Sequence, residues 1–406
     1  MTLIQPFHAL RPAPGRAAEV LSPPYDVLSS AEARERAKGK PWSFLHISKP
    51  EIDLDSSIDP YDRAVYAKAA ENLARMTASG VLVRDPKPCY YIYRLTWGER
   101  TQTGLACVAS LADYASNRIR KHELTTPLKE DDRVRQIEAV NAQTGPVMIG
   151  YPNAPEIDAM LAQAAAGAPQ VDVTADDGVR HQLWLIADGA LIDKLTGAFD
   201  ALPAIYIADG HHRSAAAARV ATAHRGAGSH EFFLAVIFPE REMTILDYNR
   251  VVKDLKGRSA DQLLAELAKS FTVMASDQPV RPASSQDYGM YLAGHWYRLT
   301  IRPELVPAND PIGRLPITVL TRNVIEPLLG IKDPRTDKRI DFIGGARGLT
   351  GLEARVNSGE MAVAFALYPT QMADLKAVAD AGGIMPPKST WFEPKLADGM
   401  VNHVLD

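Results

Sequence analysis

The stretch Tyr206–Val220, YIADGHHRSAAAARV, constrains the fold most because its hydrophobic periodicity changes within a few residues. The apolar run PAIYIA that leads into it is typical of a buried strand. The alanine-rich run after it predicts a helix that ends near Gly226. DGHHR therefore lies at a strand-to-helix turn. Such a turn directs backbone N–H groups and the positive end of a helix dipole at one place, which favours an anion.

The side chains of this turn are suited to phosphoryl chemistry. Gly210 lets the backbone approach a ligand closely, and Arg213 can contact a phosphate with two parallel hydrogen bonds. Asp209 can hold Mg²⁺ or accept a proton from an attacking hydroxyl. His211 is a candidate proton shuttle. The predicted phosphate contacts of this segment are Gly210, His212, Arg213 and Ser214.

A purely structural interpretation of the two histidines is also open, since a histidine at a turn can cap a helix or satisfy a hydrogen bond. A zinc ion shared by His211 and His212 is disfavoured because adjacent helical residues point in different directions.

Two further segments add candidate site residues. NRIRKHELT follows a predicted strand, where α/β proteins commonly place functional loops. It offers Arg118 and Lys121 as phosphate contacts, and His122 with Glu123 as an acid/base pair. The proline-stiffened loop MPPKSTWFEPKL offers a compact phosphate-binding set, Lys388, Ser389 and Thr390.

Composition limits the partners and the compartment. The formal net charge of −4 gives no electrostatic signature for nucleic acid or an anionic membrane. The two cysteines lack CxxC spacing, which indicates buried thiols in a reducing compartment. There is no secretory-type N-terminus and no apolar run of the ~20 residues that span a bilayer. The sequence therefore predicts a cytoplasmic protein, and its oligomeric state stays open.

Helical and alternating segments occur along the whole chain, which predicts a mixed α/β (α+β) fold. SFLHI is interpreted as an extended segment. The polar, proline-containing stretch Asp277–Gln286 is the predicted linker. It divides the chain into an N-terminal α/β region, residues 1–276, and a C-terminal α/β region, residues 287–406.

GHHRSAA matches the G-x-x-R-x-x-A signature of the ParB/sulfiredoxin-like superfamily, and DGHHR resembles the corresponding box of its free serine kinases. The whole chain resembles a widespread bacterial and archaeal family of unknown function. That resemblance rests on SPPYDV, SFLHI, RKHELT, IADGHHR, YNRVVKDL, DFIGG and MPPKSTWFEPKL. It implies a ParB/sulfiredoxin-like phosphate-binding core with additional α/β elements. Members of that family usually carry an aromatic residue after DGHHR, whereas this chain has Ser214.

Two classes of function follow. The first is phosphoryl transfer from ATP, ADP or pyrophosphate, with Mg²⁺, to a small-metabolite hydroxyl; the kinase resemblance makes L-serine one acceptor. Asp209 and Glu123 are the alternative bases. The second is a ParB-like nucleotide-binding regulator, which the acidic charge and the missing helix-turn-helix disfavour. A metal-dependent hydrolase using His122, Glu123, His211 and His212 is a third alternative. The roles of Trp391 and of the PPYDV loop with Tyr25 and Asp26 stay open.

Overall fold

The computed structural model describes residues 2–224 and 228–406, which form two compact units. Unit 1 runs to Met243 and includes the C-terminal segment Pro394–Asp406, and unit 2 is the intervening segment Thr244–Glu393. The division predicted at residues 277–286 differs from this one. Residues 277–286 form a surface connection inside unit 2, where Val280 is buried. A polar, proline-containing loop within a domain has the same composition as a linker.

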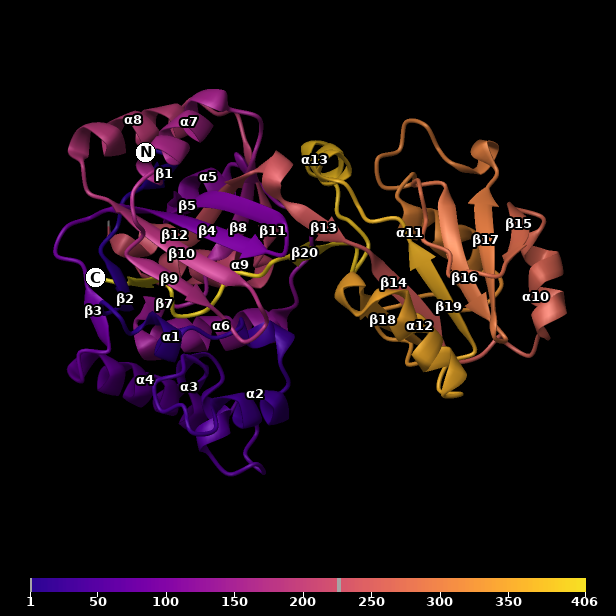
Figure 1. Cartoon of the computed structure of the whole chain (residues 1–406), viewed down its shortest axis with the longest axis horizontal. Helices are drawn as coiled ribbons and strands as arrows, with labels where there is room; N and C mark the ends of the chain where they lie inside the picture. The colour runs from indigo at the N-terminus through magenta and orange to yellow at the C-terminus, as the bar shows by residue number, and fades with distance from the viewer. Residues whose placement is uncertain (1, 225–227) are drawn as a thin grey trace. The chain divides into compact units, whose positions relative to one another are not determined.

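Unit 1 is built on a mixed sheet that has nine strands among the described residues, with β11 between β6 and β8. Strands β8 and β11 are labelled side by side in Figure 1. Strand β11 runs parallel to β6 and antiparallel to β8. The carboxyl ends of β6 and β11 therefore lie at the same edge of the sheet. The strands are β1 (Ile4–Gln5), β4 (Tyr90–Trp97), β5 (Arg100–Ser110), β6 (Ile119–Arg120), β8 (Val147–Tyr151), β9 (Val171–Thr174), β10 (Arg180–Ile186), β11 (Ile205–Asp209) and β12 (Phe232–Pro239).

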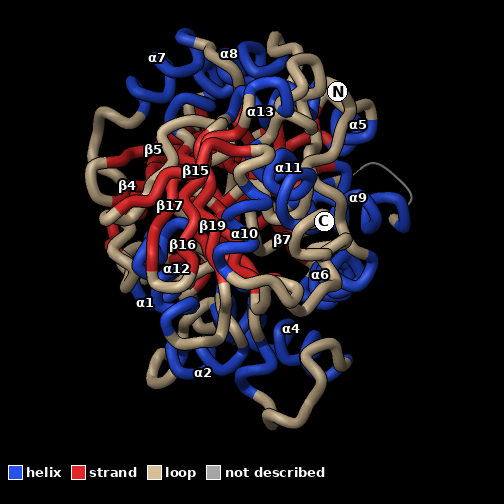
Figure 2. Tube along the Cα trace, turned by 90° about the vertical axis from the view of Figure 1, so that its right-hand side faces the viewer, coloured by secondary structure: helices blue, strands red, loops and turns tan. Residues whose placement is uncertain are grey.

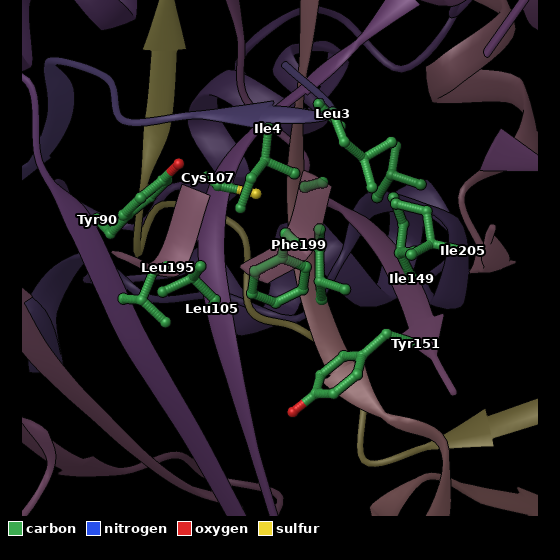
Figure 3. Packing of buried hydrophobic residues seen from close by; sticks show 14 of the residues in the cluster. Leu3, Ile4, Tyr90, Leu105, Cys107, Ile149, Tyr151, Leu195, Phe199 and Ile205 are labelled. Carbon is green, nitrogen blue, oxygen red and sulfur yellow. The ribbon is translucent and has the colours of Figure 1, made fainter. Parts of the chain in front are cut away.

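One face of this sheet carries the main core of unit 1. Alternate residues of the strands, such as Ile149 and Tyr151 of β8, pack there with Leu195 and Phe199 (Figure 3). Two helices, α7 (Pro155–Ala164) and α8 (Gly189–Asp200), contribute to this core and lie together on one side of the strands in both views (Figures 1 and 2). The short helix α5 (Leu111–Ala115) and helix α9 (His211–Ala223) reach the same core. Burying these apolar faces fixes α9 against the sheet.

A second, smaller core holds the N-terminal helices of unit 1. Val20, Phe44, Leu73 and Met76 pack together there, and α6 packs against both α4 and α9. Helix α6 thereby connects the N-terminal helices to α9. The elements are β2 (Ala9–Pro12), α1 (Ala17–Val20), the 3₁₀ turns Tyr25–Val27 and Pro50–Asp53, α2 (Ser30–Ala37), α3 (Leu45–Ser48), α4 (Arg63–Ala78), β3 (Leu82–Arg84), α6 (Pro127–Val140), β7 (Ala142–Gln143) and β21 (Asn402–Val404).

Unit 2 contains an antiparallel sheet in the order β15-β17-β16-β19-β14-β18 and a two-stranded ribbon of β13 and β20. Helix α12 packs on the sheet through Leu352. The elements are β13 (Thr244–Leu246), β14 (Tyr248–Val252), α10 (Ala260–Leu267), β15 (Phe271–Ser276), β16 (Asp287–Leu292), β17 (His295–Ile301), α11 (Pro316–Leu320), β18 (Ile340–Gly344), α12 (Gly348–Asn357), β19 (Val363–Leu367), α13 (Met372–Asp380) and β20 (Trp391–Glu393).

The mixed α/β class predicted from the sequence is confirmed. SFLHI is not extended: Leu45–Ser48 forms helix α3, because a short, largely apolar segment fits a buried helical turn as well as a strand. Helix α9 ends at Ala223, and the end predicted near Gly226 lies outside the described residues. Among the described residues, no helix is long and apolar enough to cross a membrane.

Candidate functional site

The candidate site begins where two parallel strands end. Ile205 of β11 is level with Ile119 of β6, so the residues that follow each strand emerge at the same edge. Strand β6 continues into Lys121, His122 and Glu123, and β11 ends at Asp209. The structure therefore brings RKHE and DGHHR together, although 85 residues separate them in the chain (209 − 124).

The turn between β11 and α9 is made by Gly210. Its φ of 98° lies in the left-handed region that favours glycine, and an added Cβ would come within 3.1 Å of the Arg213 guanidinium. The N–H groups of Arg213 and Ser214 donate to the Gly210 carbonyl oxygen. Those of His211 and His212 have no intrahelical acceptor because they lie in the first turn. The start of α9 can thus offer these two N–H groups to an anion.

Two cations flank Asp209 at the strand end. Arg213 Nη2 donates to Asp209 Oδ2 at 3.0 Å, and Lys395 Nζ lies 3.6 Å from Oδ1. Burial alone would raise the pKa of Asp209, but Lys395 and Arg213 outweigh it and hold the pKa well below its usual range. Asp209 is therefore firmly ionised and is a weak proton acceptor. Its clearest role in the structure is to orient the two cations.

Arg213 is a buried cation with partners from several segments. Its side chain is 11% exposed, and Nη1 donates to the carbonyl oxygen of Pro146. Asp26 lies 4.0 Å from Nη2. Burial opposes the charged form of Arg213, but Asp209 and Asp26 outweigh it and raise its pKa. The guanidinium therefore stays protonated beside the start of α9.

His211, His122 and Glu123 form a second cluster at this edge. The rings of His122 and His211 meet edge to face with centroids 4.4 Å apart, and both side chains are buried. Burial lowers the pKa of His122 to about 4 and that of His211 well below its usual value. His211 Nε2 accepts the His122 backbone N–H at 3.5 Å, so the neutral ring carries its proton on Nδ1. Nδ1 lies 3.8 Å from Glu123 Oε2.

The His122 ring has no hydrogen-bond partner of adequate geometry for either nitrogen among the described residues, although the Ile207 backbone lies near enough to affect its pKa. A buried imidazole without partners is costly. Ligand atoms of His122, Glu123 and His211 all lie within 4.8 Å of one another, so this cluster is also a candidate metal site.

His212 points to a different part of the site from His211, as expected for neighbouring helical residues. Its Nε2 accepts the Thr126 backbone N–H at 3.2 Å. Burial, followed by the Lys129 ammonium, lowers its pKa to about 4. His212 therefore does not join the metal-type cluster of His122, Glu123 and His211.

A buried carboxyl group lies behind Arg213. Asp398 is 2% exposed, and its Oδ2 accepts the Tyr25 backbone N–H at 3.2 Å. Burial raises the pKa of Asp398 to about 7, with Arg213 opposing that shift and Asp26 adding to it. The PPYDV loop is thus part of the site: it contributes Asp26 and is tied to Asp398 through Tyr25.

Three predicted contacts have other surroundings in the structure. Arg118 lies at the opposite end of β6, where it donates to the Asp200 and Leu202 carbonyl oxygens. Ser214 is fully buried, and its hydroxyl donates to the His211 carbonyl oxygen, so it faces away from an incoming anion. Lys121 Nζ lies over the Tyr114 ring at 4.1 Å, and burial lowers its pKa.

The predicted contacts Lys388, Ser389 and Thr390 belong to unit 2, and their role in the site stays a prediction. Buried Arg250 shapes their loop by donating to the Pro387 and Lys388 carbonyl oxygens. Trp391, whose role was open, pairs with Leu246 in the β13–β20 ribbon, and Gly344 leaves space for its ring. Phe392 is buried.

Sequence reasoning missed Lys395 and Asp398 as site residues. Lys395 lies in the motif MPPKSTWFEPKL, but the KST triplet that begins seven residues earlier (395 − 388) is the more typical phosphate-binding pattern. Nothing in the composition around Asp398 distinguishes it from an ordinary surface aspartate. Only the return of the C-terminal segment to unit 1 places both side chains beside DGHHR.

Comparisons with known proteins place the chain in a family without assigning its activity. A family model described as "Protein of unknown function (DUF1015)" matches residues 4–320. No curated protein sequence matches the chain. A conserved hypothetical protein from Pyrococcus furiosus is 11% identical with a TM-score of 0.35, over 70% of this chain and 91% of that one.

Two further solved structures resemble the chain to a similar degree. A free serine kinase in complex with AMP is 10% identical with a TM-score of 0.35, over 70% of this chain and 89% of the kinase. A C-terminally truncated SbnI from Staphylococcus aureus is 12% identical with a TM-score of 0.39, over 73% of this chain and 86% of SbnI. The likeness is weak at these values. The match to a family of unknown function confirms the family resemblance expected from the sequence motifs.

The raised pKa of Asp398 predicts a pH-dependent stability difference between the wild type and Asp398→Asn. The native carboxyl, with a pKa near 7, holds its proton more tightly than the unfolded one near 3.9, so it contributes a loss of stability between about pH 4 and 7. Asparagine cannot ionise. We expect Asp398→Asn to gain stability relative to wild type as pH rises through this window, by a few kcal/mol.

Calorimetric melting at pH 4, 5.5, 7 and 8 measures this difference, and shifts from other titrating groups cancel in the comparison. Asp193→Asn, at an exposed position on α8, is the control and should track the wild type at every pH. If the stabilities of Asp398→Asn and wild type change in parallel with pH, the raised pKa of Asp398 is contradicted.

Proposed function

The chain belongs to the DUF1015 family, and we propose that it transfers a phosphoryl group from a phosphate donor to a hydroxyl of a small metabolite. One observation carries this proposal: the buried Arg213 guanidinium, the start of α9 and Lys395 gather at a strand end, with a partly exposed carboxylate, Glu123, beside them. Anion-binding groups next to a proton acceptor are what phosphoryl transfer to a hydroxyl requires.

The donor phosphate would lie over Gly210–Arg213. The His211 and His212 N–H groups would donate to its oxygens, and the helix dipole would favour its charge. Arg213 and Lys395 are held at this place by Asp209, which reduces the reorganisation that binding requires. The three neutral histidines add no positive charge but can donate or accept hydrogen bonds.

In the transfer step, the acceptor oxygen forms a bond to the terminal phosphorus of the donor. The bond from that phosphorus to the bridging oxygen breaks, and the rest of the donor leaves with the electron pair. The hydroxyl proton passes to Glu123. Glu123 suits this role better than Asp209 because its side chain is 45% exposed, whereas two cations keep Asp209 ionised. His211 Nδ1–H acts as a positioning group for the Glu123 carboxylate.

The finer assignments rest on the sequence resemblance to free serine kinases. They are ATP, ADP or pyrophosphate as donor, Mg²⁺ bound with the donor, and L-serine as one acceptor. Mg²⁺ would neutralise charge on the phosphates, with Asp209 as its predicted ligand. The fit is incomplete, because the Asp209 carboxylate already faces Arg213 and Lys395. The buried free cysteines Cys89 and Cys107 support a reducing, cytoplasmic location.

A metal-dependent hydrolase is the second candidate, favoured by the ligand atoms of His122, Glu123 and His211 within 4.8 Å. The start of α9 and the nearby Arg213 and Lys395 oppose a divalent cation electrostatically. Metal analysis of the purified protein separates the two candidates. The kinase proposal expects no stoichiometric zinc, whereas one tightly held zinc per chain, lost in His122→Ala, would favour the hydrolase.

Removing the Arg213 guanidinium should weaken donor binding. We expect Arg213→Ala to reduce the affinity for pyrophosphate and ADP by roughly 1.5–3 kcal/mol, the usual scale for hydrogen bonds to charged groups. Calorimetric titration measures this, and Arg213→Lys serves as a second variant if the alanine protein melts early. Arg219→Ala is the matched control, because Arg219 lies on α9 but pairs with Asp131 at the surface. Equal donor affinity in wild type and a folded Arg213→Ala would contradict the proposed phosphate site.

Substitutions of Glu123, the proposed base, and of Asp209, which orients Arg213 and Lys395, should have different kinetic effects. We expect Glu123→Gln to lower kcat by roughly 10²–10⁴ with little change in donor KM, because it removes only the proton acceptor. Asp209→Asn should mainly raise donor KM, because Arg213 and Lys395 lose their common anchor. Phosphorus NMR of ATP, ADP and pyrophosphate against hydroxyl amino acids finds the reaction to assay. A loss of kcat in Asp209→Asn, with Glu123→Gln fully active, would reverse the two roles.

A further inference from the structure

A cavity of about 380 Å³ adjoins the candidate site within unit 1. Its lining includes His212 and Asp26 of the site, together with residues of the N-terminal helices and of α6. This space would hold about a dozen water molecules, which is far more than a phosphate group needs. A ligand bound at DGHHR could therefore extend a second, larger group into this cavity.

Four charged groups of the cavity lining form two ion pairs with each other. Lys49 Nζ lies 3.1 Å from Glu51 Oε1, which also accepts the Ser30 hydroxyl. Arg133 donates to Asp132 Oδ2 at 2.6 Å, and Tyr66 donates to Asp132 Oδ1 at 2.9 Å. These pairs leave little free charge with which the interior could hold a second ionic group.

The other two charged groups of the lining, Asp26 and Lys129, lie near residues of the DGHHR turn. Asp26 is 4.0 Å from Arg213 Nη2, and the Lys129 ammonium lowers the pKa of His212. Asp26 and Lys129 thus border residues of the phosphate site, and the other four charged groups of the lining form two neutral pairs. That distribution suits a ligand with a charged phosphate at one end and an uncharged polar group at the other.

Ser48 places in this lining a buried hydroxyl that a ligand could hydrogen-bond. It is 5% exposed, and its hydroxyl has no partner among the described residues. Ser48 lines both the large cavity and a small pocket of about 30 Å³ that reaches Arg213 and Asp398. A buried hydroxyl without a partner costs free energy, which a hydroxyl or ring nitrogen of a ligand would recover. Tyr61, 39% exposed, adds an aromatic surface to the same lining.

We infer that this cavity binds an uncharged, hydroxyl-rich group of a ligand whose phosphate lies at DGHHR. The inference rests on the proposed function, which assigns the charged end of the ligand. The same chemistry has two sources: the nucleoside of a nucleotide donor, or a polyol that accepts the phosphate. Either source is larger than a free amino acid and makes hydrogen bonds without needing an unpaired ion.

The test compares Ser48→Ala with Ser22→Ala by calorimetric titration of the full chain. Ser22 is a matched control: it is 4% exposed, its hydroxyl also has no partner among the described residues, and it lines a different pocket of about 80 Å³. Both variants should fold, because neither hydroxyl makes a hydrogen bond that would be lost. The probes are ADP, adenosine and pyrophosphate, and then ribose, myo-inositol and L-serine in the presence of pyrophosphate.

Two results would support the inference and distinguish its sources. If the nucleoside occupies the cavity, Ser48→Ala weakens ADP binding about five- to tenfold and leaves pyrophosphate binding unchanged. If an acceptor polyol occupies the cavity, ribose or myo-inositol binds to the wild type, and its affinity falls by the same factor in Ser48→Ala. The affinity for ADP is then unchanged. Ser22→Ala should match the wild type in both cases.

Unchanged affinities for ADP, adenosine and both polyols in Ser48→Ala would overturn the inference, as would Ser48-dependent binding of L-serine alone. Failure of the proposed function gives a different result. If the proposed function is wrong, Arg213→Ala does not change the affinity for pyrophosphate, while Ser48→Ala still lowers the affinity for adenosine or a polyol.

Discussion

The candidate site depends on how one buried cation, the Arg213 guanidinium, is compensated. Asp209 from the end of β11 and the Pro146 carbonyl oxygen accept its hydrogen bonds, and Asp26 approaches to 4.0 Å. A buried guanidinium without such partners would cost several kcal/mol. The strand end, the PPYDV loop and the loop before β8 must therefore meet at Arg213. Gly210 makes this possible, since a Cβ there would lie 3.1 Å from the guanidinium.

The same burial sets the protonation of the other groups and so separates their roles. His122 and His212 are neutral at physiological pH, with pKa values of about 4. Asp209 is held ionised by its cations, while Asp398, only partly compensated, titrates near pH 7. The imidazoles stay neutral and the cations stay charged across the physiological range, so the titration of Asp398 is the change of charge expected there. Glu123, the carboxylate of the cluster around His211, is 45% exposed and lies 3.8 Å from His211 Nδ1.

The sequence predicted this site where local patterns carry the information. The change of periodicity around Asp209 located the strand end, the glycine turn and the start of α9. NRIRKHELT was expected directly after a strand, but helix α5 precedes it and the two-residue strand β6 lies inside it, so only Lys121, His122 and Glu123 follow a strand. Arg118 and Lys121 flank the two-residue strand β6, so the structure places Arg118 at the end away from DGHHR, and its role in phosphate binding stays a prediction. Lys395 and Asp398 were missed because only tertiary folding returns them to unit 1. The cavity could not be predicted from the sequence for the same reason. Ser48, which lines it, ends helix α3, and this segment was predicted to be extended.

The claim that the start of α9 binds phosphate is tested most directly by selective ¹⁵N labelling of histidine and a pyrophosphate titration followed by NMR. His211 and His212 carry the first-turn N–H groups of α9 that have no intrahelical acceptor, while His181 and His403 are buried elsewhere in unit 1 and serve as internal references. The account predicts saturable shifts of the His211 and His212 backbone amides, with the reference amides unchanged. Stationary His211 and His212 amides at saturating pyrophosphate, or equal shifts of all four, would contradict it.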